Sequence, residues 1–197
     1  MYADDILLLA PTVSALKSMI KTCENFGNNA GLEFDSKKTA CVTFHHVGSC
    51  AASQGAPTIS LDGTPLKWCK YVKHLGHTMS CCSDFDKDIV VKKGHFIACV
   101  NDIITEFSFA HPHMKCKLLQ TYGTSFYGSC LWNLYGKAAT SLYTTWNIAI
   151  RKLNGVPYRT HTRFLDVISD FKHIRFSLKR RFLCFVSKLL KSTNTLI

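Results

Sequence analysis

Two adjacent carboxylates, Asp4 and Asp5, lie near the start of the chain, where they could bind metal ions. Carboxylate oxygens can bridge a pair of divalent ions, so that one ion activates an attacking hydroxyl while the other stabilises the leaving group in phosphoryl transfer. Aspartates are also frequent in ordinary turns. The pair alone therefore leaves both readings open, a metal site and a simple turn.

The residues after this pair have the pattern of a strand followed by a helix. Residues 6–10 are a short apolar run that ends before a proline, which predicts a buried strand. Apolar residues then recur at three- and four-residue spacing. This spacing predicts a helix that begins at Thr12 or Ser14, covers the sheet with one face, and ends at Gly27 or Gly31.

Further short strands are predicted up to residue 80. Strand-like residues occupy 39–44, and the small-residue composition of 48–57 predicts a loop. An Asp-Gly pair within 59–66 predicts a hairpin, because these residues accept the positive φ angles that a tight turn requires. Strand character resumes over 71–79. The first part of the chain is thus predicted to be a small sheet with one covering helix.

Helical spacing replaces strand alternation after Ser80, which predicts a domain boundary there. Helices are predicted to begin at Asp84 and Pro112, a third to end at Gly155, and a basic helix to follow near the end of the chain. The residues expected on their apolar stripes are Ile89, Phe96, Val100, Ile103 and Phe107, then Leu118, Leu119 and Tyr122, then Leu142, Trp146, Ile150 and Leu153, and finally Ile174, Leu178, Phe182, Phe185 and Leu189.

The charge balance points to a polyanionic partner. The chain has 24 Lys and Arg residues against 13 Asp and Glu residues, and the excess is concentrated in its last third. A solvated basic face is the alternative interpretation. The cations that lie outside the apolar stripe are the better candidates for contact with a nucleic-acid backbone: Arg159, Arg163, Lys179, Arg180 and Arg181.

Cysteine and histidine residues are numerous, but their spacing does not predict a disulfide scaffold or a zinc site. The ten cysteines follow no signal peptide, which favours reduced thiols in an intracellular protein. No apolar stretch is long enough to cross a bilayer, so no membrane is expected. Two groups contain the right residue types for zinc but lack paired Cys-x-x-Cys spacing: Cys69, His74, His77, Cys81 and Cys82, and Cys41, His45, His46 and Cys50.

Several blocks, in order along the chain, resemble the reverse transcriptases of non-LTR, LINE-type retrotransposons, especially the jockey-like group. Tyr2-Ala3-Asp4-Asp5 with the following apolar run is similar to the family's catalytic turn and strand. Residues 31–39 resemble the next block, with Asp35 where the family usually has Asn. Residues 72–77 resemble the block that forms the primer-gripping hairpin, with His74 in place of the usual aromatic residue. Similarity to thumb and post-thumb segments continues at 131–132, 146–151 and 157–161.

The resemblance implies a role for each matching residue. Asp4 would ligate catalytic Mg²⁺, with Asp5 as a supporting ligand, and Tyr2 would pack near the primer end. Lys38 would lie near the phosphates of the incoming nucleotide, where an ammonium can neutralise charge that builds on pyrophosphate. Leu75 and Gly76 would lie next to the primer.

The fold implied is α+β: a truncated polymerase palm over residues 1–80, made of short antiparallel strands with one covering helix, a helical thumb over 81–155 and a basic helical extension over 156–197. The intact enzyme would copy RNA into DNA with an RNA template, a DNA primer and dNTP. The fingers, the first catalytic carboxylate and the endonuclease would belong to missing parts of a longer polyprotein, so we expect no polymerase activity from this chain alone. Two alternatives are a non-catalytic nucleic-acid-binding remnant and a translated relic. Nuclear and cytoplasmic ribonucleoprotein locations are both open.

Overall fold

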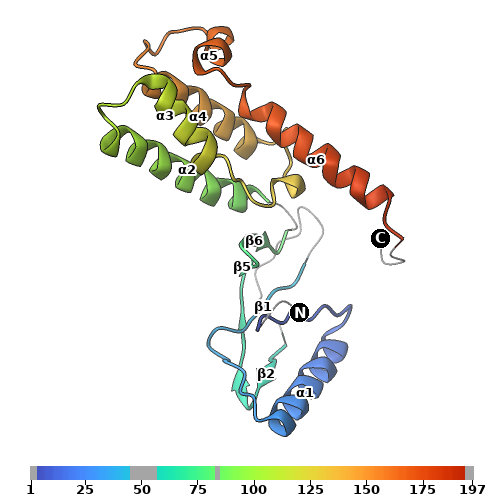
Figure 1. The fold of residues 1–197 in the computed structure, drawn as a ribbon. Coiled ribbons are helices and arrows are strands. Elements are labelled where there is room, and N and C mark those ends of the chain that lie inside the picture. The colour runs from blue at the N-terminus through green and yellow to red at the C-terminus, as the bar shows by residue number, and fades with distance from the viewer. Residues whose placement is uncertain (1–3, 45–56, 83–84, 194–197) are drawn as a thin grey trace. The chain divides into compact units, whose positions relative to one another are not determined.

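The computed structural model describes residues 4–44, 57–82 and 85–193, and over these residues the fold is α+β (Figure 1). The chain divides into two compact units. The first runs as far as Val72 and adds residues 80–83, and the second contains 73–79 and the residues from 84 onward. The described part of the chain has six α-helices and short two-stranded sheets, so the predicted α+β class is confirmed.

Helix α1, Val13–Ala30, is delimited by residues that the sequence predicted. The Thr12 hydroxyl accepts a hydrogen bond from the Ala15 backbone N–H at 3.2 Å and so satisfies one of the free donors of the first turn. Gly31 adopts φ 67°, a left-handed angle that ends the helix, and its N–H donates to the Gly27 carbonyl. The predicted helix is therefore confirmed at both ends.

The strands of the first unit are short. Strand β2, Ser60–Leu61, pairs antiparallel with β3, Thr64–Pro65, and the intervening Asp62 and Gly63 have φ angles of 48° and 75°. This hairpin confirms the prediction made from the Asp-Gly pair. Strand β1, Ala40–Cys41, pairs in parallel with β4, Lys67–Trp68, so the expectation of antiparallel strands is wrong for this pair.

The apolar run at 6–10 is not a strand. Apart from an isolated bridge at Asp5, these residues join no sheet in the described part of the chain, and Ile6, Leu7 and Leu9 are exposed. An extended segment becomes a strand only when a neighbour pairs with its backbone groups, and pairing is a long-range property that the run itself does not specify. Most of the predicted loop at 48–57 lies outside the described residues. The core of the first unit consists of Ile20, Cys41, Ile59, Leu61 and Leu66.

Residues 71–80 form a hairpin, which agrees with the strand character predicted over 71–79. Strands β5, Tyr71–His74, and β6, His77–Ser80, belong to one two-stranded sheet. The turn between them consists of Leu75 at φ 47° and Gly76 at φ 77°. Two consecutive residues with positive φ match the twist of antiparallel strands.

The second unit contains five α-helices, coloured from green to red in Figure 1. They are α2, Asp86–Glu106; α3, Pro112–Leu118; α4, Lys137–Leu153; α5, Thr162–Ser169; and α6, Ile174–Leu190. The predicted cap Asp84 lies outside the described residues, and α5 was not predicted. None of the helices in the described ranges is long and apolar enough to cross a membrane.

The core of the second unit lies mainly between α2 and α4. The rings of Phe96 and Trp146 stack with centroids 5.6 Å apart, and the prediction that Trp146 belongs to the core is confirmed. Tyr122, expected on the apolar stripe of a helix from Pro112, is exposed. A π-helical turn, Leu119–Gly123, follows α3 and changes the angle between successive side chains, which breaks the predicted periodicity.

Three of these helices begin with a histidine. His111, His161 and His173 are the N-caps of α3, α5 and α6, and each Nδ1 accepts the backbone N–H two residues further on, at 3.3, 3.2 and 3.1 Å. The pKa of His173 is lowered mainly by burial and further by the charge of Arg175, against an opposing effect of Asp166. Since only a neutral imidazole has an acceptor nitrogen, these caps require unprotonated histidines.

Candidate functional site

The two N-terminal carboxylates lie in a surface turn of the first unit. Asp4 is in the turn, Asp5 forms the isolated bridge, and both are exposed. Tyr2 lies outside the described residues. In the ranges that the structure describes, no group of three or more His, Cys, Asp or Glu side chains could hold a metal ion. Asp4 and Asp5 could thus offer a metal ion two carboxylates, both from the same segment of the chain.

The loop that carries Lys38 is organised by Asp35. The Asp35 Oδ1 atom accepts the backbone N–H groups of Lys37 at 2.8 Å and Lys38 at 3.3 Å, and these hydrogen bonds, the Lys37 bond foremost, lower the pKa of Asp35. The exposed Lys38 ammonium lies 3.7 Å from Asp35 Oδ2. An asparagine oxygen could accept the same backbone bonds, so this turn does not depend on the charge of Asp35. The described residues record no ion pair between Lys38 and either Asp4 or Asp5.

The hairpin turn at Leu75–Gly76 contacts helix α2 within the second unit. The Gly76 carbonyl accepts a hydrogen bond from Lys92 Nζ of α2 at 3.0 Å. A side chain at Gly76 would contact the ring of Tyr127 at 3.7 Å, and the Lys92 ammonium lies 5.6 Å from the centre of the same ring. Leu75 is exposed at the tip. The turn thus presents one apolar side chain on a fixed base.

Asp88 of α2 holds strand β6 in place, and the sequence alone did not identify this residue. Asp88 is fully buried on α2; its Oδ1 accepts the Thr78 backbone N–H at 3.1 Å, and its Oδ2 accepts the Trp132 indole N–H at 2.8 Å. His77 Nδ1 lies 3.9 Å from Oδ2, which is too long for a hydrogen bond, so this nitrogen has no hydrogen-bond partner among the described residues. Asp88 therefore ties β6 to α2 and to the segment around Trp132.

One sequence signal could have identified Asp88. A buried tryptophan needs an acceptor for its indole N–H, and Asp88 is an acidic residue one position from the predicted stripe residue Ile89. Acidic residues in the first turn of a helix are usually exposed, because they complement the helix dipole from the surface. For this reason the position of Asp88 in the first turn of α2 did not indicate that its carboxylate is buried in the core.

The predicted nucleic-acid-binding cations differ in what they contact. Arg159, Arg163 and Arg180 are exposed, and Lys179 lies with its Nζ 5.6 Å from the ring centre of Tyr135. The guanidinium of Arg181 donates to three backbone carbonyls, those of Ser125 at 2.6 Å, Thr124 at 2.9 Å and Phe126 at 3.3 Å. Arg181 therefore fixes the loop that follows the π-helical turn, whereas the other four present charge to solvent.

The predicted site residues fall into both units. Asp4, Asp5 and Lys38 belong to the first unit, and Leu75, Gly76 and the late basic residues belong to the second. Of the two cysteine and histidine groups, His45, His46 and Cys50 lie outside the described residues. Comparison with protein-family models, with curated proteins and with solved structures finds no match for this chain.

Proposed function

We propose that this chain is part of an RNA-directed DNA polymerase of a non-LTR retrotransposon, with the end of the palm over residues 1–80, the thumb over 81–155 and a basic extension over 156–197. The observation that carries the proposal is the hairpin of β5 and β6. Its turn, Leu75–Gly76, occurs within the block that resembles the primer-gripping hairpin, and it is held by Lys92 and Asp88 of the helix that follows.

The donor set at the start of the chain suits magnesium. Mg²⁺ prefers carboxylate and water oxygens, and Asp4 and Asp5 offer adjacent exposed carboxylates at a turn. Bound Mg²⁺ would supply charge stabilisation for nucleotidyl transfer. Asp4 would hold the ion and Asp5 would support it, while the exposed ammonium of Lys38 would bind the phosphates of the dNTP.

Template and primer would bind through charge. Arg159, Arg163, Lys179 and Arg180 leave cationic groups at the surface of the second unit, and phosphate contacts by such groups release counterions from nucleic acid. Binding to an RNA–DNA heteroduplex should therefore weaken steeply as salt rises, by a slope that grows with the number of contacts. Leu75 would make the apolar contact at the primer.

A primer-extension assay tests the catalytic part of the proposal. The purified chain is mixed with a labelled DNA primer on an RNA template, dNTPs and Mg²⁺, next to Asp4→Ala and the control Glu33→Ala, which alters another exposed acid. We expect no extension from this chain alone, because the first catalytic carboxylate would belong to a missing part of the polyprotein. Magnesium-dependent extension that only Asp4→Ala abolishes would contradict this expectation and would mean that the chain is itself an active polymerase. Extension that survives Asp4→Ala contradicts the role of this residue.

The second candidate function is non-catalytic nucleic-acid binding. The exposed cations of the second unit favour it independently of the carboxylates. Fluorescence anisotropy of the same heteroduplex should then show salt-sensitive binding that Asp4→Ala leaves unchanged and Arg180→Ala weakens. Binding without extension is expected of the isolated chain under both proposals, and the absence of binding contradicts both.

A further inference from the structure

Helix α6 carries a second apolar stripe that faces away from the core. Ile174 and Leu178 are buried in the second unit, but Phe176, Leu183 and Leu190 are exposed by 58%, 64% and 83%. These three residues follow one another at intervals of seven. Apolar residues at seven-residue intervals lie along one line of a helix and are typical of a seam that packs against another helix.

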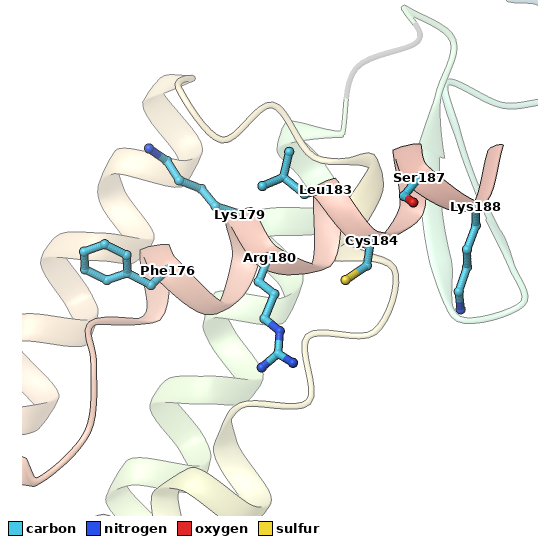
Figure 2. A pocket seen from close by; sticks show the side chains of 7 residues that line it. All are labelled: Phe176, Lys179, Arg180, Leu183, Cys184, Ser187 and Lys188. Carbon is cyan, nitrogen blue, oxygen red and sulfur yellow. The ribbon is translucent and has the colours of Figure 1, made fainter. Parts of the chain in front are cut away.

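The sides of this stripe are cationic and its surface is hollowed. Figure 2 shows Lys179 and Leu183 on one side of the helix and Arg180, Cys184 and Lys188 on the other. A hollow of about 610 Å³ is lined by residues from Phe176 to Lys188, with the small side chains Cys184 and Ser187 between the larger ones. A second hollow of about 430 Å³ adjoins Leu183 and is lined by Tyr135, Phe182 and neighbouring residues. The small side chains of Cys184 and Ser187 leave space next to Leu183 into which a side chain of a partner helix could pack.

The charge of α6 selects the kind of partner. The sequence of Ile174–Leu190 contains Arg175, Lys179, Arg180, Arg181 and Lys188 but no acidic residue. Acidic residues on a partner helix would meet these cations at the flanks of the seam. A second copy of this chain would instead bring the same cations against them, because a symmetric contact places one patch against itself, and the whole chain carries a net charge of +11.

The apolar residues distinguish a protein partner from a nucleic acid. Single-stranded nucleic acid binds by stacking its bases on aromatic side chains, and beyond Phe176 the stripe continues with Leu183, Cys184, Ser187 and Leu190. The aromatic rings of Phe182 and Tyr135 lie beside Leu183 in the second hollow, but the aliphatic and small side chains of the stripe itself offer no flat stacking surface. They fit the leucines of an amphipathic helix.

We propose that the exposed face of α6 binds an acidic amphipathic helix of another protein. Leu183 occupies the centre of the contact, Phe176 and Leu190 extend it one heptad in each direction, and Arg180 and Lys188 pair with acids on one flank. This surface shares Arg180 with the cations proposed to bind template and primer, but none of its apolar residues has a role in template or primer binding, so the leucine variants test it separately from the polymerase proposal.

The test uses the full chain and a fluorescein-labelled helical peptide about three heptads long, with Leu at the a and d positions and Glu at e and g. Anisotropy should rise on binding, and Leu183→Asp should weaken the affinity at least about tenfold. The matched control is Val167→Asp on α5, where an apolar residue of 80% exposure lies outside the face. Leu190→Asp, at the end of the helix, repeats the test if Leu183→Asp loses its helical circular dichroism.

Two further arms separate the sources of binding. A peptide with Lys at e and g should not bind, and Arg180→Glu should weaken the acidic peptide while Arg163→Glu on α5 should not. The proposal is overturned if the acidic peptide fails to bind, if Val167→Asp weakens it as much as Leu183→Asp, or if the two leucine variants leave it unchanged. A single-stranded RNA that depends on Leu183 when the peptide does not would reassign the face to nucleic acid.

Discussion

Replacing the buried carboxylate of Asp88 should weaken the attachment of strand β6 to helix α2. The two oxygens of Asp88 accept N–H groups from Thr78 and Trp132, and the residue has no exposed surface. A buried donor left without an acceptor costs about 1–3 kcal/mol. Asp88→Ala leaves both N–H donors without an acceptor and should lower the free energy of unfolding by about 2–6 kcal/mol. Asp88→Asn has nearly the same volume but turns one acceptor into a donor, so it should cost about 1–3 kcal/mol.

Urea unfolding followed by helical circular dichroism measures these costs. Asp86→Asn is the matched control, because Asp86 is an exposed carboxylate in the same first turn of α2 and its removal should cost no more than about 1 kcal/mol. Trp132→Phe removes the indole donor and completes a double-mutant cycle. The double variant should be more stable than the summed single costs predict, by at least about 0.5 kcal/mol, because the Asn amide no longer faces an indole N–H.

Two results would refute this reasoning. If Asp88→Asn costs no more than Asp86→Asn, the buried carboxylate does not hold the hairpin. If the costs of Asp88→Asn and Trp132→Phe simply add, the 2.8 Å hydrogen bond between the two side chains contributes nothing measurable.

Three other predictions concern single residues of the second unit. Arg181→Ala should lower the urea midpoint, because three carbonyls lose their donor, whereas Arg180→Ala should leave the midpoint unchanged and weaken heteroduplex binding in anisotropy. Gly128→Ala should destabilise strongly, since φ is 76° and the added Cβ would overlap the ring of His77; Gly155→Ala, at φ 63° in open space, isolates the cost of φ alone in the same urea experiment. Burial depresses the pKa of His173 below its usual 6.5. The stability that this cap contributes is therefore present above pH 6.5 and is lost as the pH falls through the lowered pKa. His173→Asn keeps an oxygen that can cap the helix, so the melting temperature of this variant should fall less in an acid titration.

The parts of the fold that the sequence predicted are those that depend on neighbouring residues. Thr12 and Gly31 delimit α1 through bonds within one helical turn, and Asp62-Gly63 makes its hairpin through its own φ angles. The apolar stripe of α2 was predictable from Ile89 to Ile103 for the same reason, because its periodicity is local, whereas Phe107, also expected on it, follows the helix and is exposed. Each of these features could be inferred without knowing which segments meet in space.

Several failures involve a partner that is distant in sequence. Residues 6–10 have strand composition, but no described strand pairs with them, and the parallel pairing of β1 with β4 joins segments separated by the β2–β3 hairpin. Asp88 looked like a surface residue because Trp132, its partner, is far along the chain. Arg181 looked available for nucleic acid because nothing local shows that the loop before Tyr127 would take its donors.

The hairpin tip is the element whose sequence is hardest to explain as structure alone. A two-residue turn with positive φ at both positions favours Asn-Gly or Asp-Gly, yet a leucine occupies the first position at φ 47° and remains exposed. Such a conformation costs of order 1–3 kcal/mol and persists only where the surroundings determine it. Lys92 and Asp88 supply that constraint from α2, and Tyr127 supplies it from the loop that Arg181 holds. Strained conformations cluster at functional sites, so the conformation of this turn is consistent with the proposed contact between Leu75 and the primer.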